Sequence, residues 1–101
     1  LKDLDIVLEE EPGYVDALVF RASAKRQLNQ RDSAAVDIGH ALAKNEDHLE
    51  GLLERGMLRR LLNDISGARS DWLKIINLAP DSETARFARE KIQNMDGAKN
   101  R

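Results

Sequence analysis

The sequence predicts an all-α fold built from antiparallel helix-turn-helix units that repeat every 34 residues. Shifting the chain against itself by 34 residues aligns eight identical pairs among thirty, where ordinary residue usage gives about two. Within each unit, apolar residues recur three and four positions apart, which is the spacing of one helix face. The 101 residues include only two prolines and six glycines, so little interrupts the helices.

We expect about six helices in one domain over residues 1–95, with short turns making neighbouring helices antiparallel. Because Leu1 lies in what reads as the middle of a helix, we expect the native N-terminus to be missing from this sequence. The expected parts are the second helix of a truncated repeat (1–13), a repeat with helices near 14–29 and 33–44 (14–47), a repeat with helices near 48–62 and 67–78 (48–81), a C-terminal capping helix (82–95) and a frayed tail (96–101).

Polar residues separate these helices. The stretches "NQRDS" (29–33) and "NDIS" (63–66) predict turns, with their serines at the starts of the following helices. Asp47 with Glu50 resembles a capping box, and Asp81 or Ser82 is expected to cap the last helix. Pro12 and Pro80 are expected just beyond helix ends, where proline cannot continue a helix.

Small residues recur where the two helices of a repeat should touch. Ala22 and Gly56 occupy one register position in the first helices, and Ala34 and Ala68 occupy one in the second. A glycine within a helix costs about 1 kcal/mol relative to alanine, so Gly56 needs a structural reason. We expect these small side chains to face one another and let the helix axes approach closely. A leucine at position 56 should therefore overpack the contact.

These units resemble the tetratricopeptide repeat (TPR) family. The second unit carries the family pattern best and the first carries part of it, with Glu46 where the family has proline. The resemblance covers about residues 1–95 and implies a right-handed α-solenoid whose first helices line a concave groove for a protein partner. The residues that match are Leu52, Gly56, Ala68, Trp72, Ile75 and Pro80 in the second unit, and Leu18, Ala22, Ala34, Ile38 and Ala41 in the first.

Arginines and aspartates also recur at a spacing of 34. The sequence looks like a bacterial subset of the family that has Arg-Gly in the first helix and Ala-x-x-Asp in the second, and we infer Arg–Asp pairs that join helices. One pairing lies within repeats, Arg21 with Asp37 and Arg55 with Asp71. The other lies between repeats and is slightly preferred because it leaves no member unpaired: Asp3 with Arg21, Asp37 with Arg55, and Asp71 with Arg89.

Helical geometry then identifies the residues that should line the groove. They share the side of each first helix that points away from the second helix, and they combine apolar residues with cations. Such a groove suits an extended or helical peptide with apolar anchors and an acidic group. The expected groove residues are Val19, Phe20, Ser23, Arg26 and Gln27, then Leu53, Glu54, Met57, Arg60 and Leu61, then Phe87 and Lys91.

The sequence offers no pattern for catalysis or cofactor binding. His40 and His48 are two helical turns apart, too far to hold one metal ion, and we expect both on the surface. There is no cysteine and no phosphate-binding loop, dinucleotide-binding or metalloprotease motif. The net charge of −2 gives no electrostatic case for nucleic acid, and no apolar run reaches the roughly 18 residues that a membrane span needs. We therefore expect no enzyme, no cofactor, and no nucleic-acid or membrane partner.

The expected function is a non-catalytic module that binds a peptide or protein of unknown identity. In the resembling TPRs that bind chaperone tails, a basic and asparagine-rich clamp occupies positions that here hold Val19, Ser23 and Glu54, which argues against a ligand ending in EEVD. Two alternatives remain open. One is a structural or self-association element of a longer helical-repeat array, with Leu1, Leu4 and Leu8 exposed on the first helix. The other is a regulatory segment of a larger protein. The resemblance allows a bacterial protein inside or outside the cytoplasm.

Overall fold

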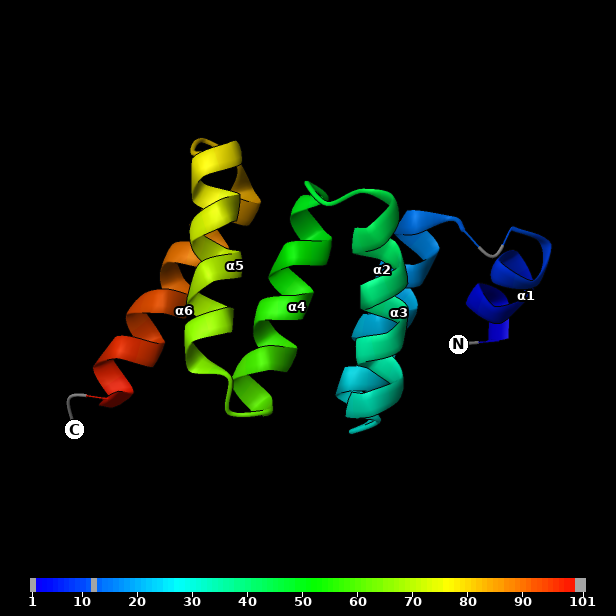
Figure 1. Cartoon of the computed structure of the whole chain (residues 1–101), viewed down its shortest axis with the longest axis horizontal. Helices are drawn as coiled ribbons and strands as arrows, with labels where there is room; N and C mark the ends of the chain where they lie inside the picture. The colour runs from blue at the N-terminus through cyan, green and yellow to red at the C-terminus, as the bar shows by residue number, and fades with distance from the viewer. Residues whose placement is uncertain (1, 12, 100–101) are drawn as a thin grey trace.

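The architecture is a row of antiparallel helices, as the all-α expectation requires (Figure 1). The computed structural model describes residues 2–11 and 13–99, and this part of the chain is 45 × 28 × 19 Å in extent. The described residues form six helices: α1 (Lys2–Glu10), α2 (Val15–Gln27), α3 (Arg31–Lys44), α4 (Leu49–Leu61), α5 (Ile65–Leu78) and α6 (Glu83–Lys99).

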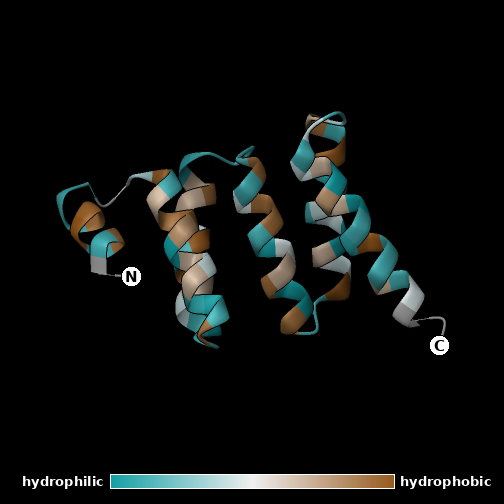
Figure 2. Ribbon diagram, turned by 180° about the vertical axis from the view of Figure 1, so that it is seen from behind, coloured by the Kyte–Doolittle hydropathy of each residue, from teal (hydrophilic) through white to brown (hydrophobic). Residues whose placement is uncertain are grey.

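The helices form two layers. α2 packs against α3 and α4 packs against α5, so each pair is one helical hairpin of the repeat. α4 also contacts both α2 and α6, which places these three alternate helices in one layer, while α3 and α5 form the other. In Figure 1, α3 and α5 stand in front of α2 and α6. Figure 2 therefore looks onto the layer of α2, α4 and α6, where apolar and polar bands alternate along α4.

Two helices begin at residues other than those expected from the sequence, and the helix caps differ accordingly. α3 and α5 begin two residues earlier than expected, so Ser33 and Ser66 lie in first turns rather than at helix starts. α5 begins early because the Asp64 carboxylate accepts a hydrogen bond from the Gly67 backbone N–H at 2.9 Å. For α6, Ser82 Oγ accepts from the Ala85 N–H at 3.0 Å, so this expected cap is confirmed.

The turns inside the two hairpins are built alike. Asn29 and Asn63 have φ of 63° and 67°, the left-handed conformation that asparagine tolerates at a helix C-terminus. The next residue in each turn returns its N–H to the helix, from Gln30 to the Lys25 carbonyl at 2.8 Å and from Asp64 to the Arg59 carbonyl at 2.7 Å. These bonds satisfy carbonyls that the helix end leaves free.

The two ends of the chain differ from expectation. α6 continues to Lys99, beyond the expected end near residue 95, while residues 100–101 lie outside the described residues. Pro80 follows α5 as expected, whereas Pro12 lies outside the described residues. On α1, the prediction that Leu8 is bare is wrong, because its residue surface is only 6% exposed.

One apolar core runs through the row of helices. Leu4 packs against this core beside Leu8, so the exposed apolar residues of α1 are Ile6 and Val7, and Leu1 lies outside the described residues. All the small residues singled out in the repeats are buried. The largest fully buried side chains belong to Trp72, Ile38, Leu52, Leu58 and Ile75.

Gly56 is required by the indole of Trp72. A Cβ built at position 56 would lie 2.3 Å from Trp72 Nε1 and 2.7 Å from its Cε2, far inside van der Waals contact. The Trp72 ring is rigid and fully buried, so it has little room to move aside. The expected close approach therefore exists, but the atoms nearest to the missing side chain belong to Trp72 and not to Ala68.

The equivalent position in the first repeat supports the explanation that Trp72 leaves no room for a side chain at position 56. Ala22 stands 34 residues before Gly56, and Ile38 stands 34 residues before Trp72. Both members of this smaller pair are buried. An isoleucine is smaller than an indole and leaves room for a methyl group on the facing helix. The glycine of one repeat and the alanine of the other therefore follow from the size of the residue sixteen positions later.

We predict that Gly56→Ala lowers the free energy of unfolding by about 1–3 kcal/mol, because the new methyl group overpacks against the indole. In a Trp72→Ile background, the same substitution should cost less or add stability, since alanine favours the helix by about 1 kcal/mol. Urea unfolding of the four proteins in this double-mutant cycle measures the coupling. An equal cost of Gly56→Ala in both backgrounds would contradict the assignment of Trp72 as the constraint.

Candidate functional site

The candidate site is the α2/α4/α6 face, by which we mean the surface of these helices turned away from α3 and α5. Three of its apolar side chains are exposed to solvent, those of Phe20, Leu61 and Phe87. Polar and partly covered side chains lie among them, at Ser23, Gln27, Leu53 and Met57. The face therefore combines exposed apolar side chains with polar ones.

Two residues expected in an open groove are instead buried. Val19 has only 3% of its surface exposed and belongs to the core, because α4 packs beside α2. Glu54 is 8% exposed. A buried carboxylate requires a partner, and Glu54 has one in Arg26.

Arg26 and Glu54 form a bidentate ion pair between α2 and α4. Arg26 Nε donates to Glu54 Oε2 at 2.7 Å, and Nη2 donates to Oε1 at 3.1 Å. The two side chains are 18% and 11% exposed, so solvent screens the pair only in part. This pair ties neighbouring repeats together and holds the Arg26 guanidinium in one orientation.

A hollow lies beside this ion pair. It has a volume of about 410 Å³, and its wall includes side chains from α2, α4, α5 and α6. The structure thus brings together five of the residues expected in the groove, together with Trp72, which was expected only in the core. The lining residues are Arg26, Met57, Arg60, Leu61, Trp72 and Lys91.

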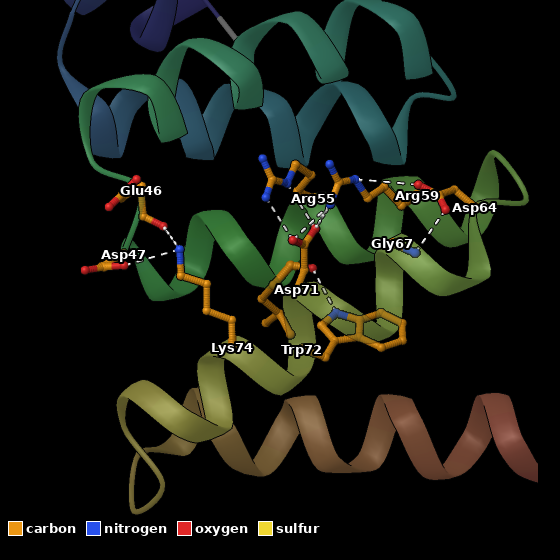
Figure 3. Close-up of polar contacts among 10 residues, drawn as sticks. Glu46, Asp47, Arg55, Arg59, Asp64, Gly67, Asp71, Trp72 and Lys74 are labelled. Carbon is orange, nitrogen blue, oxygen red and sulfur yellow. Dashed lines mark hydrogen bonds and ion pairs between the residues drawn. The ribbon is translucent and has the colours of Figure 1, made fainter.

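Trp72 was missed as a lining residue because its register position indicated a core side chain. It is fully buried as a residue, and its Nε1–H donates to the Leu53 carbonyl of α4 at 3.3 Å (Figure 3). No local pattern in the sequence shows that the edge of the Trp72 ring, on α5, reaches the layer of α2, α4 and α6.

The aspartates of α3 and α5 pair within repeats, so the preferred pairing between repeats is wrong. Arg21 donates to both carboxylate oxygens of Asp37 at 2.8 and 2.7 Å. Arg55 does the same to Asp71 at 3.0 and 2.9 Å. The two helices of each hairpin pack more extensively on each other than α3 packs on α4, which favours the pairing within repeats.

The remaining members of the preferred pairing have other partners. Arg89 donates to the Pro80 carbonyl at 2.7 Å, not to Asp71. On α1, the acidic partner of Arg21 is Asp5 at 3.1 Å, not Asp3.

A second cation completes each of these pairs. Lys25 Nζ lies 2.9 Å from Asp37, and Arg59 Nη1 lies 3.0 Å from Asp71, where Figure 3 shows it beside Arg55. Lys25 and Arg59 are 34 residues apart and follow the paired arginines by one helical turn. That spacing was the signal that would have identified them.

These contacts change the pKa values of the paired groups. Burial acts to raise the pKa of Asp37, but the hydrogen bonds from Arg21 and Lys25 outweigh it and hold that pKa below its ordinary value. The hydrogen bond to Asp37 raises the pKa of Arg21, and the hydrogen bond to Asp71 raises that of Arg55. The pair of Arg21 and Asp37 is therefore fully charged at neutral pH.

His48 is not the surface residue that the sequence suggested. Its Nδ1 accepts a hydrogen bond from the Gly51 N–H at 3.0 Å and so caps α4, a role expected for Asp47. Its Nε2 lies 2.7 Å from Asp16 on α2. With Nδ1 as acceptor, Nε2 carries the proton and donates to Asp16. His40, by contrast, is exposed.

Neither metal binding nor membrane spanning finds support in the described part of the chain. Residues 2–11 and 13–99 contain no group of three or more histidine, cysteine or acidic side chains placed to hold a metal ion. Within the same residues, no helix is both long and apolar enough to cross a bilayer.

Comparison with solved structures shows that the fold is that of TPR domains. "First TPR of Spaghetti (RPAP3) bound to HSP90 peptide SRMEEVD" superimposes with a TM-score of 0.77 and 23% identity, covering 93% of this chain and 75% of that one. The NMR structure of the first TPR domain of human RPAP3 also gives 0.77 and 23%, with coverages of 96% and 77%. No protein-family model and no curated protein matches the chain.

A bacterial TPR protein is similar as well. The crystal structure of a tetratricopeptide repeat protein from Parabacteroides merdae ATCC 43184 matches with a TM-score of 0.78 and 27% identity. The match covers 94% of this chain but 37% of that protein, so this chain spans little more than a third of its length. The Arg-Gly subset remains a prediction.

We predict that Asp37→Asn lowers the free energy of unfolding by about 2–4 kcal/mol at neutral pH, because it leaves two partly buried cations without their carboxylate. The native pKa of Asp37 lies below the unfolded value of about 3.9. The contribution of Asp37 to the free energy of unfolding is therefore present above about pH 4. It is lost as the pH falls through the native pKa of this carboxyl group.

Urea unfolding at about pH 5 and about pH 3 tests this sign. The wild type should lose more stability between these pH values than Asp37→Asn does. Asp32→Asn, an exposed residue of the same helix, is the matched control and should behave as the wild type. Equal acid sensitivity of the wild type and Asp37→Asn would refute the ion-pair account.

Proposed function

We propose that this chain is a non-catalytic protein-interaction module that binds a peptide segment of a partner against its α2/α4/α6 face. The hollow of about 410 Å³ carries the proposal, because cationic and apolar side chains from four helices converge on it. Its size lies within the range of about 300–1,000 Å³ typical of ligand pockets.

The exposed apolar side chains of this face support a peptide rather than a small ion as ligand. Phe20, Leu61 and Phe87 are exposed on three successive helices of this face. Exposed aromatic and aliphatic side chains at separate positions suit the alternate anchors of an extended or helical peptide. Half-buried Met57, between them, adds a side chain that adapts its shape to the ligand.

The similarity to a TPR domain bound to an HSP90 peptide also favours a peptide ligand. We do not extend the SRMEEVD sequence to this chain. Of the positions that correspond to the chaperone-tail clamp, Val19 is in the core and Glu54 is an anion already paired with Arg26. The cations of this face lie elsewhere, at the hollow.

Selection from a random peptide library displayed on phage tests the proposal. Binding of the selected peptides should weaken about tenfold in Phe20→Ser/Leu61→Ser, because two apolar anchors are lost. Val36→Ser/Leu73→Ser is the matched control, since these residues have similar exposure but lie on α3 and α5. A loss of binding in the control variant, with binding retained in the first, would place the ligand on the opposite layer and contradict the proposal.

A second candidate function is self-association through α1. Ile6 is 48% exposed and Val7 is 39% exposed on this terminal helix. Solvent-exposed neighbouring apolar side chains are common at interfaces. On this proposal, α1 packs against a second copy of the chain.

Sedimentation over a range of protein concentrations tests self-association. An α1 interface predicts dimers whose fraction rises with concentration and falls in Ile6→Lys/Val7→Lys. Val36→Lys/Leu73→Lys, with exposed apolar residues outside α1, should leave the dimer fraction unchanged. A monomer at all concentrations would remove this candidate.

A further inference from the structure

The hollow on the α2/α4/α6 face carries an excess of positive charge. Arg26, Arg60 and Lys91 all line it, and no acidic residue does. The adjacent Glu54 neutralises Arg26 through the bidentate pair. Within the described residues, the side chains of Arg60 and Lys91 have no hydrogen bond or ion pair, so two cations at the hollow lack a counter-charge.

The other acids of α2 and α4 on this face are too distant to supply that charge. Asp16 precedes Arg26 by ten residues on α2, and Glu50 precedes Arg60 by ten residues on α4. Ten residues correspond to about 15 Å along a helix, beyond the Debye length of about 8 Å at physiological ionic strength. Asp16 is also engaged with His48. Asp16 and Glu50 are therefore electrically separate from the cations at the hollow.

Apolar groups form the rest of the wall of the hollow. Met57 and Leu61 come from α4, and Trp72 from α5. An anion held beside such groups is partly shielded from water, so its attraction to a cation is stronger than at an open surface. Met57 and Leu61 also offer contact area to an apolar side chain next to the anion. The hollow thus favours an acidic residue with an apolar neighbour over a free ion.

Arg60 on α4 and Lys91 on α6 are both unpaired within the described part of the chain, so a ligand that neutralises them needs two negative charges. Flexible side-chain carboxylates of one peptide can reach both cations, whereas one terminal carboxylate carries a single charge. The lining also lacks the amide and hydroxyl side chains that bind a terminal carboxylate by neutral hydrogen bonds. These features favour side-chain carboxylates within a peptide over a free C-terminus.

We infer that the hollow selects a peptide segment with at least two acidic side chains flanking an apolar residue. Arg60 and Lys91 bind the carboxylates, and Met57 and Leu61 contact the apolar side chain. Glu54 limits the affinity for such a segment, because it holds Arg26 and adds a negative charge beside the site. This inference rests on the proposed function and names the chemistry of the partner.

Peptide selection on charge-reversed protein tests the inference. Peptides selected on the wild type should be acidic, and those selected on Arg60→Glu/Lys91→Glu should be neutral or basic. Wild-type peptides should bind this variant at least tenfold more weakly. Lys44→Glu/Lys74→Glu makes the same change of net charge on α3 and α5 and should retain the acidic preference. Circular dichroism melting confirms that each variant is folded.

The failures of the two proposals are distinguishable. Neutral or basic peptides that bind the wild type, and that depend on Phe20 and Leu61, would overturn the acidic inference and leave the proposed function standing. Acidic peptides selected equally by wild type and Arg60→Glu/Lys91→Glu would also overturn it. Peptides that depend on Val36 and Leu73 would overturn both proposals.

Two further measurements test the details with one selected acidic peptide. Glu54→Gln should bind it severalfold more tightly, because a competing charge is removed while the new amide side chain keeps an oxygen that accepts from Arg26. Unchanged or weaker binding by this folded variant would overturn the limiting role of Glu54. Amidation of the peptide C-terminus should leave the affinity unchanged. A tenfold loss on amidation would show that the terminal carboxylate is the group recognised.

Discussion

The packing of the Trp72 indole on the backbone of Gly56 is the contact on which the rest of this structure depends. It sets how closely α4 and α5 approach, because any side chain at position 56 would enter the ring. The same ring donates a hydrogen bond to Leu53 of α4 and contributes to the hollow on the opposite layer. Trp72 therefore takes part in both the helix packing and the candidate binding site. Because α4 packs on this side chain, the position of α4 affects the shape of the hollow.

Charges are distributed differently on the two sides of α4. Toward α5, the buried Asp71 is held by Arg55 and Arg59, so this contact has a cation on each side of one carboxylate. Toward α2, the buried Glu54 holds Arg26. In both contacts the carboxylate lies inside and the arginines reach toward solvent, which lets an ion pair join helices without leaving a buried charge unpaired. Arg60 and Lys91, which have no ion pair among the described residues, lie at the hollow.

The repeat of 34 residues was sufficient to predict the number of helices, the hairpins and the burial of Ala22, Ala34 and Ala68. It was not sufficient to predict the ion pairs. Arg21 is 16 residues from Asp37, and Asp37 is 18 residues from Arg55, so both pairings connect helices that are adjacent along the chain. The Ser82 cap was predicted, but two other caps were beyond the pattern, because His48 and Asp64 cap through side-chain orientation, which the order of residue types does not specify.

The sequence by itself determined which residues share a helix face, because that property depends only on the local period of the helix. It placed Val19 and Phe20 on one side of α2, and Arg26, Arg60 and Lys91 on the equivalent sides of three helices. Only the tertiary structure decided which of them are open to a partner. α4 covers Val19 and leaves Phe20 exposed, and Glu54 neutralises Arg26 but not Arg60. Burial and pairing depend on what lies beside a helix, and the periodicity of one helix carries no information about its neighbours.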